Sequence, residues 1–388
     1  MLITPMLHQG GFERICVLTA RLLQERGYQV VIVVFSMEDI AFDISGLTVI
    51  DLKLKARKSK LGKIINIFKR CLKLSVLQRK LRTDVSYSFG MTANIANALS
   101  FGAGKKLTAC HSFEEIKNNL YMKLISRHSD KIFCCSKKMA DLVQENYHFK
   151  NVYPLWNPCD IENVLRGSAK EPDQDIDYFR TKDKVLVSMG REDDVKGFWH
   201  LLKIFRRINE EEKDTRLAII GDGNFAEYQR LAEKLSLKDK VFFTGLKKNP
   251  FPYLKESDIY ILTSLSEGLP NALVEALALS LPIVSANCLS GPAEILHEDF
   301  KFAERQREVF CADYGILSPV LSTEKNLTVA YKEDGTVLLE EAEEKFAQAV
   351  LMLLRDKELY GKYAEKAGKR VKDFSTDNYL EGLLTLME

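Results

Sequence analysis

Short apolar runs alternate with longer amphipathic stretches in the first half of the chain. Helix-length patterns such as Glu13–Arg26 and Asn118–His128 lie between most of the runs. The runs have the length of strands, and strands are predicted over Gln29–Phe35, Leu47–Leu52, Asp84–Phe89, Lys105–Ala109, Lys131–Cys135 and Val152–Leu155. Strands that alternate with helices favour a parallel, doubly wound sheet.

The same alternation returns after a polar, charged stretch near Arg166–Lys184, which is typical of a linker. Helices are predicted over Phe198–Asn209 and Ala226–Leu235, and two or three more over Glu340–Glu388. The second set of predicted strands is Val185–Met189, Arg216–Ile220, Val241–Thr244, Asp258–Thr263 and Pro282–Ala286. A second parallel sheet is therefore expected.

The length of 388 residues predicts two to three domains. A composition of 46% hydrophobic and 28% charged residues is that of a soluble globular protein. We predict an α/β fold with a first domain at 1–165, a linker at 166–183, a second domain at 184–355 and C-terminal helices at 356–388.

No apolar run approaches the length of about 18 residues that a membrane-spanning helix needs, so none is expected. No cationic and apolar signal segment precedes the first glycine pair, Gly10-Gly11, and export is not expected. The eight cysteines are scattered without a Cys-x-x-Cys pair, which favours reduced thiols in a cytoplasm.

Charge is distributed unevenly along the chain. Residues 1–170 carry 26 Lys and Arg against 14 Asp and Glu, whereas the remainder carries 30 against 40. The cationic excess is concentrated in residues 52–83, which hold twelve Lys and Arg and no acid. One half of the protein is therefore expected to face an anionic partner.

The most informative pair of residues is Glu267 and Glu275, eight positions apart. Glu267 lies in a polar turn after the apolar run Ile259–Thr263, and Glu275 lies in a helix whose first turn holds Pro270. The amides that open a helix can receive a diphosphate, and proline fits the first helical position because its missing N–H costs nothing there. The two carboxylates can accept hydrogen bonds from sugar and ribose hydroxyls. Exposed helices often carry glutamates too, so the surrounding residues decide between a site and a solvated surface.

Further candidates follow two other predicted strands. Arg191, Gly221 and Glu267 each come just after a strand, and ligands of open parallel sheets bind at the carboxyl ends of strands. If the diphosphate site holds a nucleotide sugar, the nucleoside diphosphate gains negative charge as its bond to the sugar breaks. Fixed cations at Arg191 and Lys196 would then stabilise the transition state of that reaction more than the ground state. The alternative is a pair of solvated loop charges.

Glu267-x7-Glu275 resembles the Glu-x7-Glu motif of retaining glycosyltransferase family 4, whose members have the GT-B fold. The resemblance continues through other segments in the family's order. They are Gly10-Gly11-Phe12-Glu13-Arg14, Gly190-Arg191 with Lys196-Gly197, Ile219-Ile-Gly221-Asp-Gly223 and Ser290-Gly-Pro-Ala-Glu294-Ile-Leu296. It implies two Rossmann-like domains that face each other across a cleft. The first would handle the acceptor and the second the nucleotide sugar, and the last helix would pack back towards the first domain.

The resemblance also implies roles for single residues. Arg191 and Lys196 would clamp the donor diphosphate, Glu267 would contact the donor sugar and Glu275 would bind the ribose. His111 ends the strand Lys105–Ala109 at a position like that of the family's first-domain histidine, where it would position the transferred sugar. His8, beside the glycine pair, is the alternative histidine. The remaining donor-binding candidates are Gly10, Gly11, Gly221, Gly268, Leu269, Pro270 and Asn271.

The expected enzyme is a metal-independent retaining hexosyltransferase that needs no cofactor, only a nucleotide-sugar co-substrate such as a UDP-hexose or UDP-N-acetylhexosamine. No carboxylate is clearly placed as a double-displacement nucleophile, which favours a same-face substitution. Asp173-Gln-Asp175-Ile-Asp177 contains two overlapping Asp-x-Asp triplets, the pattern that bridges a metal to diphosphate in transferases of another fold. No apolar strand precedes these triplets, so they are interpreted as linker acids.

The basic segment Lys53–Arg82 also contains apolar residues at helical spacing: Leu61, Ile64, Ile65, Phe68, Leu72 and Val76. They predict a first-domain helix with its apolar stripe on the sheet and a solvated basic face. The basic face fits anionic lipid headgroups as well. Nucleic acid is not expected, because Phe68 is the segment's one aromatic residue and bases need aromatic platforms.

The resemblance assigns the acceptor to this N-terminal half, and together with the basic face it implies a glycan acceptor linked to polyprenyl diphosphate, as in bacterial capsule, O-antigen or lipid-linked oligosaccharide assembly. The enzyme would then be cytoplasmic and peripheral on the inner face of the plasma membrane, docked through Lys53–Arg82. A soluble transferase acting on a small or polymeric non-lipid sugar is the alternative, and a non-enzymatic binding protein on the same scaffold is a third hypothesis.

Overall fold

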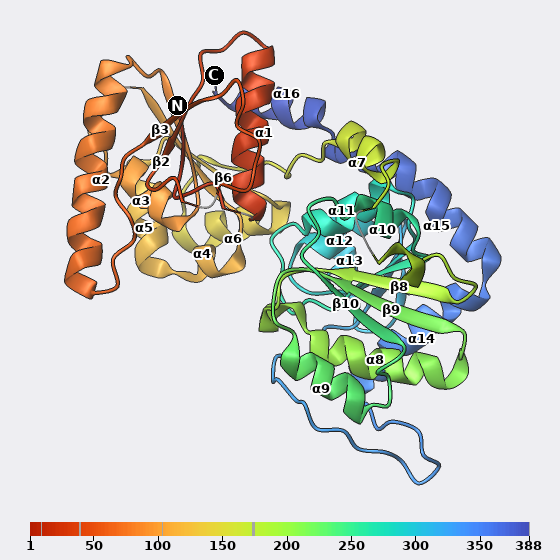
Figure 1. Ribbon diagram of the computed structural model, residues 1–388. Helices are drawn as coiled ribbons and strands as arrows, with labels where there is room; N and C mark the ends of the chain where they lie inside the picture. Colours follow the sequence, from red (N-terminus) through yellow and green to blue (C-terminus); the bar gives the residue numbers. More distant parts are fainter. Residues whose placement is uncertain (9, 39, 103, 173–174, 388) are drawn as a thin grey trace. The chain divides into compact units, whose positions relative to one another are not determined.

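A computed structural model describes residues 1–8, 10–38, 40–102, 104–172 and 175–387. The chain forms two compact units (Figure 1). Unit 1 contains Met1–Pro158 together with the chain from Thr376 onward, and unit 2 contains Cys159–Ser375. The expectation of an α/β protein with two parallel, doubly wound sheets is confirmed, as the strand orders below show.

Unit 1 is built on a parallel sheet whose described strands have the order β3-β2-β1-β4-β5-β6-β7. Side chains alternate between the two faces of a strand, so Leu2 enters the core beneath α1 while Ile3 enters the core on the opposite face. The strands are β1 (Leu2–Thr4), β2 (Val31–Val34), β3 (Thr48–Asp51), β4 (Val85–Phe89), β5 (Lys105–Cys110), β6 (Lys131–Cys134) and β7 (Val152–Pro154).

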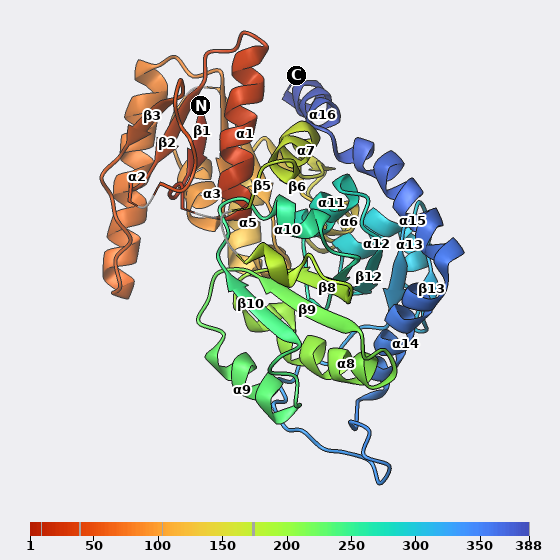
Figure 2. The ribbon, with the colours of Figure 1, turned by 45° about the vertical axis from the view of Figure 1, so that its right-hand side comes forward.

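Helices cover both faces of this sheet (Figure 1, Figure 2). On one face Ile15 of α1 and Tyr379 of α16 share a core, and on the other Leu74 of α2 and Ala93 of α3 share a second core. The helices are α1 (Gly11–Glu25), α2 (Lys60–Lys80), α3 (Met91–Ala98), α4 (Phe113–Lys117), α5 (Asn119–His128), α6 (Lys137–Tyr147) and α16 (Thr376–Met387). Among the described residues, no helix is long and apolar enough to cross a bilayer.

Unit 2 repeats the plan, with its described strands in the order β10-β9-β8-β11-β12-β14-β13. Among the strands that the structure describes in this unit, only the edge strand β13 runs antiparallel to its neighbour. The strands are β8 (Lys184–Met189), β9 (Thr215–Ile220), β10 (Val241–Gly245), β11 (Ile259–Leu262), β12 (Ile283–Ala286), β13 (Phe310–Cys311) and β14 (Ile316–Ser318). The helices used below are α7 (Ile161–Ser168), α8 (Phe198–Glu211), α9 (Ala226–Lys234), α11 (Asn271–Ala278), α12 (Gly291–Leu296), α14 (Glu341–Arg355) and α15 (Lys357–Arg370), with the short 3-10 turns η1 (Ile176–Tyr178) and η2 (Asp194–Lys196).

The linker predicted at 166–183 is wrong, because that stretch belongs to unit 2. The Asn249 side chain donates a hydrogen bond to the Gly167 carbonyl oxygen at 2.8 Å. The Tyr178 hydroxyl donates to the carbonyl oxygens of Leu217 at 3.2 Å and Lys240 at 2.7 Å. The polar stretch is therefore held to unit 2 by hydrogen bonds to main-chain carbonyl oxygens and is not a free connection.

The C-terminal helices predicted at 356–388 are divided between the units. α15 stays in unit 2, where Tyr363 is fully buried and its hydroxyl donates to the Ala312 carbonyl oxygen at 3.2 Å. Only the chain from Thr376 returns to unit 1, where the hydroxyls of Tyr379 and Thr19 are 2.8 Å apart. The expected return to the first domain thus applies to α16 alone.

The apolar stripe predicted to pack on the first sheet instead faces outward on α2. Its residues Leu61, Phe68 and Val76 are 69%, 63% and 66% exposed. The buried side of α2 includes polar residues, Asn66, Arg70 and Gln78 among them. Helical spacing located the helix correctly but gave the wrong face.

Candidate active site

The carboxyl ends of three adjacent strands in unit 2 carry the main predicted site residues. Arg191 follows β8, Gly221 follows β9 and Glu267 follows β11, and β8 lies between β9 and β11 in the sheet. Because these strands are parallel, their carboxyl ends lie at one edge. The structure therefore brings residues that are up to 76 positions apart in the sequence to the same edge of the sheet.

Lys196 and Glu267 form the central contact of this edge. The Lys196 Nζ lies 2.6 Å from the Glu267 Oε1, and the Ser264 hydroxyl donates to the same oxygen at 2.8 Å. The side chains are 26% and 12% exposed, so the pair is accessible from one side. The aliphatic part of the Lys196 side chain lies along Gly190, where a Cβ would be 3.1 Å from the Lys196 Cδ. Because Gly190 has no side chain, Lys196 has the space that it needs to reach the Glu267 carboxylate.

The loop that carries Lys196 is fixed to the end of β11. Gly197 has a φ of +62°, and a Cβ there would overlap the Thr263 carbonyl oxygen. The Thr263 hydroxyl donates to the Lys196 carbonyl oxygen at 3.0 Å, and the Leu265 amide donates to the Val195 carbonyl oxygen at 2.8 Å. The sequence Lys-Gly is thus needed at this position because only glycine allows the left-handed turn and the close approach together.

Arg191 lies on a loop whose main chain is held rigidly. A Cβ on Gly221 would overlap the Gly190 carbonyl oxygen, so Gly221 serves here as the surface on which the Arg191 loop packs. The Glu192 carboxylate accepts hydrogen bonds from the amides of Asn224 at 2.7 Å and Phe225 at 2.9 Å. The Arg191 side chain itself is exposed and forms no ion pair within the part of the chain that the structure describes. A guanidinium on a fixed loop is suited to an anionic ligand.

Helix α11 begins one residue later than predicted, and Pro270 is its N-cap rather than its first helical residue. The Pro270 side chain makes no cap hydrogen bond to this helix start. Leu269 and Pro270 are buried beneath α12, because a Cβ on Gly291 would lie 2.5 Å from the Pro270 Cδ and 2.8 Å from the Gly268 carbonyl oxygen. Asn271 opens the helix, half-buried. Proline at the N-cap contributes no side-chain acceptor of its own, and the amides of a helix start are suited to a phosphate.

Glu275 lies in the second turn of α11 and is only 4% exposed. A buried carboxylate at this place is not a solvated surface glutamate. Tyr260, inside β11, is a residue that the sequence analysis missed. Burial raises the pKa of the Tyr260 hydroxyl, and the charges of Glu267 and Glu275 raise that pKa further. A polar atom within the otherwise apolar run Ile259–Leu262 was the available signal.

In unit 1, His111 lies at the carboxyl end of β5 between two aromatic rings. Its ring is stacked with Phe12 at 6.3 Å between centroids and with Phe89 at 5.9 Å. The His111 amide donates to the Glu115 carboxylate at 2.7 Å, which fixes the main chain. Burial lowers the pKa of His111 to about 4, although the Asn157 side chain acts to raise that pKa. The imidazole is therefore neutral at pH 7 and can hydrogen-bond a hydroxyl group without carrying charge.

This depressed pKa predicts a pH dependence for the stability of unit 1. An unfolded histidine has a pKa near 6.5, so the unfolded chain takes up the proton first as the pH falls. Above pH 6.5 the effect is absent, and between pH 6.5 and 4 unit 1 should lose roughly 2 kcal/mol of unfolding free energy. His111→Phe, which can stack between the same rings without titrating, should not show this loss.

Urea unfolding at pH 7 and pH 4.5 measures the effect as a difference between wild type and His111→Phe. The exposed His128, replaced by Phe, is the matched control for a general effect of losing a histidine. If the difference in unfolding free energy between wild type and His111→Phe is the same at pH 7 and pH 4.5, the imidazole of His111 is not buried in its neutral form.

The glycine pair near the start of α1 has a different local role from the predicted one. A Cβ on Gly10 would overlap the Glu13 carboxylate, so the space beside Gly10 is filled by that side chain rather than open to a phosphate. Glu13 is 7% exposed, and Gly11 is exposed. The alternative histidine, His8, is exposed as well. Donor binding by Gly10 and Gly11 stays a prediction.

The Asp-x-Asp segment falls partly outside the description of the structure. Asp173 and Gln174 are not among the described residues. The Asp175 carboxylate forms an ion pair with the Lys247 Nζ at 2.9 Å, and Asp177 lies in η1. Asp175 is thus engaged by a cation of its own unit.

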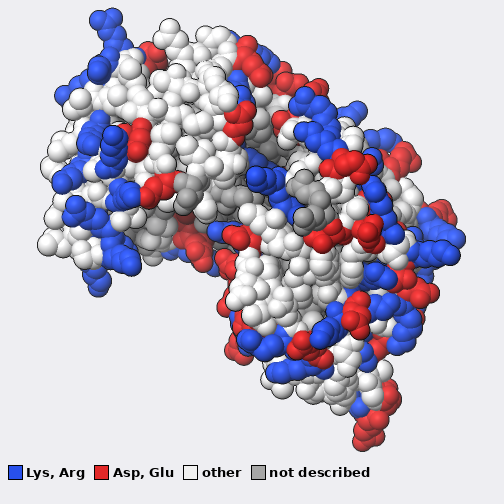
Figure 3. All heavy atoms as spheres, viewed as in Figure 1, with Lys and Arg blue, Asp and Glu red and all other residues white. Residues whose placement is uncertain are grey.

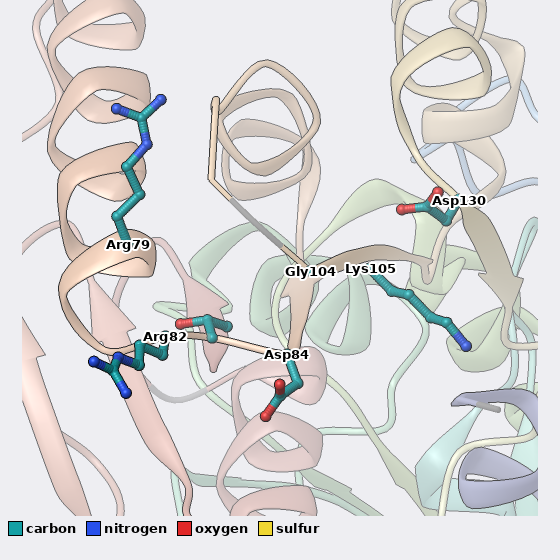
Figure 4. A pocket seen from close by; sticks show the side chains of 7 residues that line it. Arg79, Arg82, Asp84, Gly104, Lys105 and Asp130 are labelled. Carbon is teal, nitrogen blue, oxygen red and sulfur yellow. The ribbon is translucent and has the colours of Figure 1, made fainter.

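A hollow in unit 1 lies at the opposite edge of the first sheet, where β4 and β5 begin. It is lined by Arg79, Arg82, Thr83, Asp84, Gly104, Lys105 and Asp130. The cationic ends of Arg79, Arg82 and Lys105 point in different directions (Figure 4). Divergent cations interspersed with two acids do not form a cradle for a phosphate, so this hollow is not assigned to the site.

Two family models match consecutive parts of the chain. The model described as Glycosyltransferase Family 4 matches residues 9–163. The model described as Glycosyl transferases group 1 matches residues 170–308, which contain Arg191, Lys196, Glu267 and Glu275. The two matches therefore fall on unit 1 and unit 2 in turn.

Individual proteins agree with these matches. An uncharacterized glycosyltransferase of Methanocaldococcus jannaschii is 29% identical over 71% of this chain and 69% of its own length. The N-acetylgalactosamine-N,N'-diacetylbacillosaminyl-diphospho-undecaprenol 4-alpha-N-acetylgalactosaminyltransferase of Campylobacter jejuni is 26% identical over 76% of this chain and 82% of its own length. The crystal structure of Anabaena HepE in complex with UDP superposes with a TM-score of 0.74 and 15% identity, covering 99% of this chain and 98% of HepE.

Two matching family models, glycosyltransferase relatives and a shared fold lead to one assignment. The resemblance drawn from the sequence motifs is confirmed, and with it the predicted fold class. The chain belongs to the GT4-type glycosyltransferases, with their GT-B fold of two Rossmann-like domains.

Proposed function

We propose that this glycosyltransferase moves a hexose or N-acetylhexosamine from a nucleoside diphosphate sugar, UDP being the expected nucleotide, to a lipid-linked glycan. The configuration of the anomeric carbon would be retained, and the product would serve bacterial surface polysaccharide assembly. The observation that carries the proposal is the arrangement of Arg191, the Lys196–Glu267 pair and the start of α11 at one edge of the second sheet.

The donor diphosphate is assigned to the cations and to the helix start. As the glycosidic bond breaks, charge accumulates on the departing phosphate oxygen, and Arg191 and Lys196 would stabilise it there. The opening amides of α11 add a positive partial charge. Glu267 holds Lys196 at 2.6 Å, so the same carboxylate can orient the lysine and accept a hydrogen bond from the donor sugar. Glu275 would accept hydrogen bonds from the ribose hydroxyls.

The proposed chemistry is a same-face substitution. The bond between the anomeric carbon and the phosphate oxygen breaks, and a bond to the acceptor oxygen forms on the same face. The acceptor proton passes to the departing phosphate oxygen, so no separate protein base is required. Neutral His111 would position the transferred sugar through a hydrogen bond to one of its hydroxyls.

The nucleotide and the acceptor are supported by different proteins. UDP is bound in the HepE structure that shares this fold. The name of the Campylobacter relative contains a diphospho-undecaprenol glycan, which supports an acceptor of the polyprenyl diphosphate class. The excess of cations in residues 52–83 favours work at an anionic surface, on the inner face of the plasma membrane. A soluble sugar acceptor is the alternative.

A panel of nucleotide sugars in a thermal-shift assay, followed by donor hydrolysis with the best binder, tests the proposal. Ligand at about 100 times its dissociation constant contributes roughly 2.7 kcal/mol to the native state, so UDP and the correct UDP-sugar should raise the Tm by several degrees. NMR of the released product would show the retained anomer first. If no nucleoside diphosphate shifts the Tm, the assignment of the site fails.

Activity should persist in excess EDTA. Arg191 and Lys196 supply the positive charge that a bridging Mg²⁺ or Mn²⁺ supplies in metal-dependent transferases. Donor hydrolysis measured in 5 mM EDTA, about the usual chelating excess, should stay within about twofold of the untreated rate. Loss of activity that added Mg²⁺ or Mn²⁺ restores would show that the metal-independent mechanism is incorrect.

A further inference from the structure

Helix α2 in unit 1 presents its apolar side to solvent. Leu61, Ile64, Ile65, Phe68, Leu72 and Val76 are 69%, 65%, 40%, 63%, 45% and 66% exposed, and we name them the apolar stripe. At about 100° per residue they fall within an arc of roughly 120°. A surface helix of a soluble protein usually places such an arc on its core, so this orientation needs an explanation.

The orientation is fixed by polar contacts on the opposite side of the helix. The Asn66 side chain donates to the Lys55 carbonyl oxygen at 2.6 Å, and Arg70 donates to the Leu54 carbonyl oxygen at 2.8 Å. The Lys73 Nζ donates to the Leu52 carbonyl oxygen at 2.6 Å. Rotating α2 to bury the stripe would break these bonds and leave main-chain carbonyls without partners. The outward stripe is therefore a stable feature of unit 1.

Cations border the stripe along the whole helix. Lys60, Lys69, Arg79 and Lys80 are exposed, and none forms an ion pair within the described chain. Lysine and arginine appear interspersed with uncharged surface where α2 lies in Figure 3. Long cationic side chains can rest their stems on apolar material while their charges reach a polar boundary. The apolar stripe thus matches the acyl-chain layer of a membrane interface, and the bordering cations match its headgroup layer.

We propose that α2 lies in the plane of an anionic lipid membrane and inserts the apolar stripe among the acyl chains, with the bordering cations on the headgroup phosphates. This rests on the proposed function, whose acceptor would be embedded in the same membrane. A second copy of the chain is a poor occupant, because residues 52–83 would bring twelve cations and no acid against an identical surface. Anionic lipid supplies both the apolar phase and the opposite charge.

Vesicle co-sedimentation of the full chain separates insertion from purely electrostatic attraction. Binding to phosphatidylcholine vesicles containing phosphatidylglycerol should weaken at high salt yet remain measurable. Ile64→Ser combined with Phe68→Ser should lower partitioning at least tenfold at both salt concentrations. Leu120→Ser is the matched control, because Leu120 is 84% exposed on α5 of the same unit and should leave binding unchanged.

A tryptophan reporter locates the stripe directly. In a Trp156→Phe background, Phe68→Trp should give fluorescence that brominated lipids quench, whereas the other native tryptophan, Trp199, fully buried in unit 2, should not be quenched. Equal binding of the double variant and the wild type would overturn the proposal. So would a stable dimer in size-exclusion chromatography that the double variant abolishes, with no vesicle binding by the wild type.

Failure of this inference and failure of the proposed function have different signatures. Donor hydrolysis in solution needs no membrane, so the double variant should hydrolyse the nucleotide sugar at the wild-type rate. If the protein binds vesicles through the apolar stripe but binds no nucleotide sugar, the proposed function is wrong and the insertion of α2 is still supported. A protein that hydrolyses the donor without any dependence on the stripe for vesicle binding would do the reverse.

Discussion

Arg191→Ala is expected to lower kcat about 10²–10³-fold, in donor hydrolysis and in transfer alike. The guanidinium would act on the charge that develops on the departing phosphate, so the loss should fall on kcat more than on the KM for the donor. The side chain is exposed and pairs with no described residue, so its removal leaves no buried charge behind and the Tm should change little.

Arg230→Ala is the matched control, because Arg230 is an exposed arginine on α9 of the same unit. It should retain the wild-type kcat. Lys196→Ala would be a less clean test, since it also deprives Glu267 of its partner at 2.6 Å. Near-normal turnover by Arg191→Ala would remove the central assignment of the site.

Glu275→Gln should weaken UDP binding about tenfold or more in calorimetry. Charge-assisted hydrogen bonds contribute about 1.5–3 kcal/mol each, and the amide keeps the volume of the side chain while losing its charge and one acceptor. Glu275 is only 4% exposed, so a contact with ribose would be well shielded from water.

The ligand itself provides the control for this prediction. Wild type should discriminate strongly between UDP and 2',3'-dideoxy-UDP, whereas Glu275→Gln should bind both with similar, weak affinity. If the variant discriminates as well as the wild type does, Glu275 does not bind the ribose. A variant that binds both nucleotides normally would lead to the same conclusion.

The sequence predicted the sheets and the edge of the second sheet well because both depend on local patterns. Short apolar runs fix strands, and the carboxyl ends of neighbouring parallel strands must meet. The strand pattern therefore places Arg191, Gly221 and Glu267 correctly at one edge of the sheet. Tyr260 was missed because a tyrosine in a strand resembles an ordinary core residue, and its neighbours come from distant turns.

Other features depend on partners that local patterns do not reveal. The apolar spacing in α2 predicted a buried stripe, but the bonds from Arg70 and Lys73 to residues 52–54 span 16 and 21 positions and turn the helix round. Tyr178 likewise binds carbonyl oxygens 39 and 62 positions away, which no composition of a linker could show. The stacking of His111 between Phe12 and Phe89 also joins residues that are far apart in the sequence, so local patterns do not reveal it.

The position of α16 has a consequence for the order in which the protein can be made. Tyr379, Leu380 and Leu383 are buried in a core whose other members include Leu2 and Ile15. A ribosome synthesises all of residues 159–375 between the two parts of that core. Unit 1 therefore receives its full set of core side chains only after residues 159–375 have been made, and a fragment that stops at Pro158 would leave the apolar surface beneath α16 open to water.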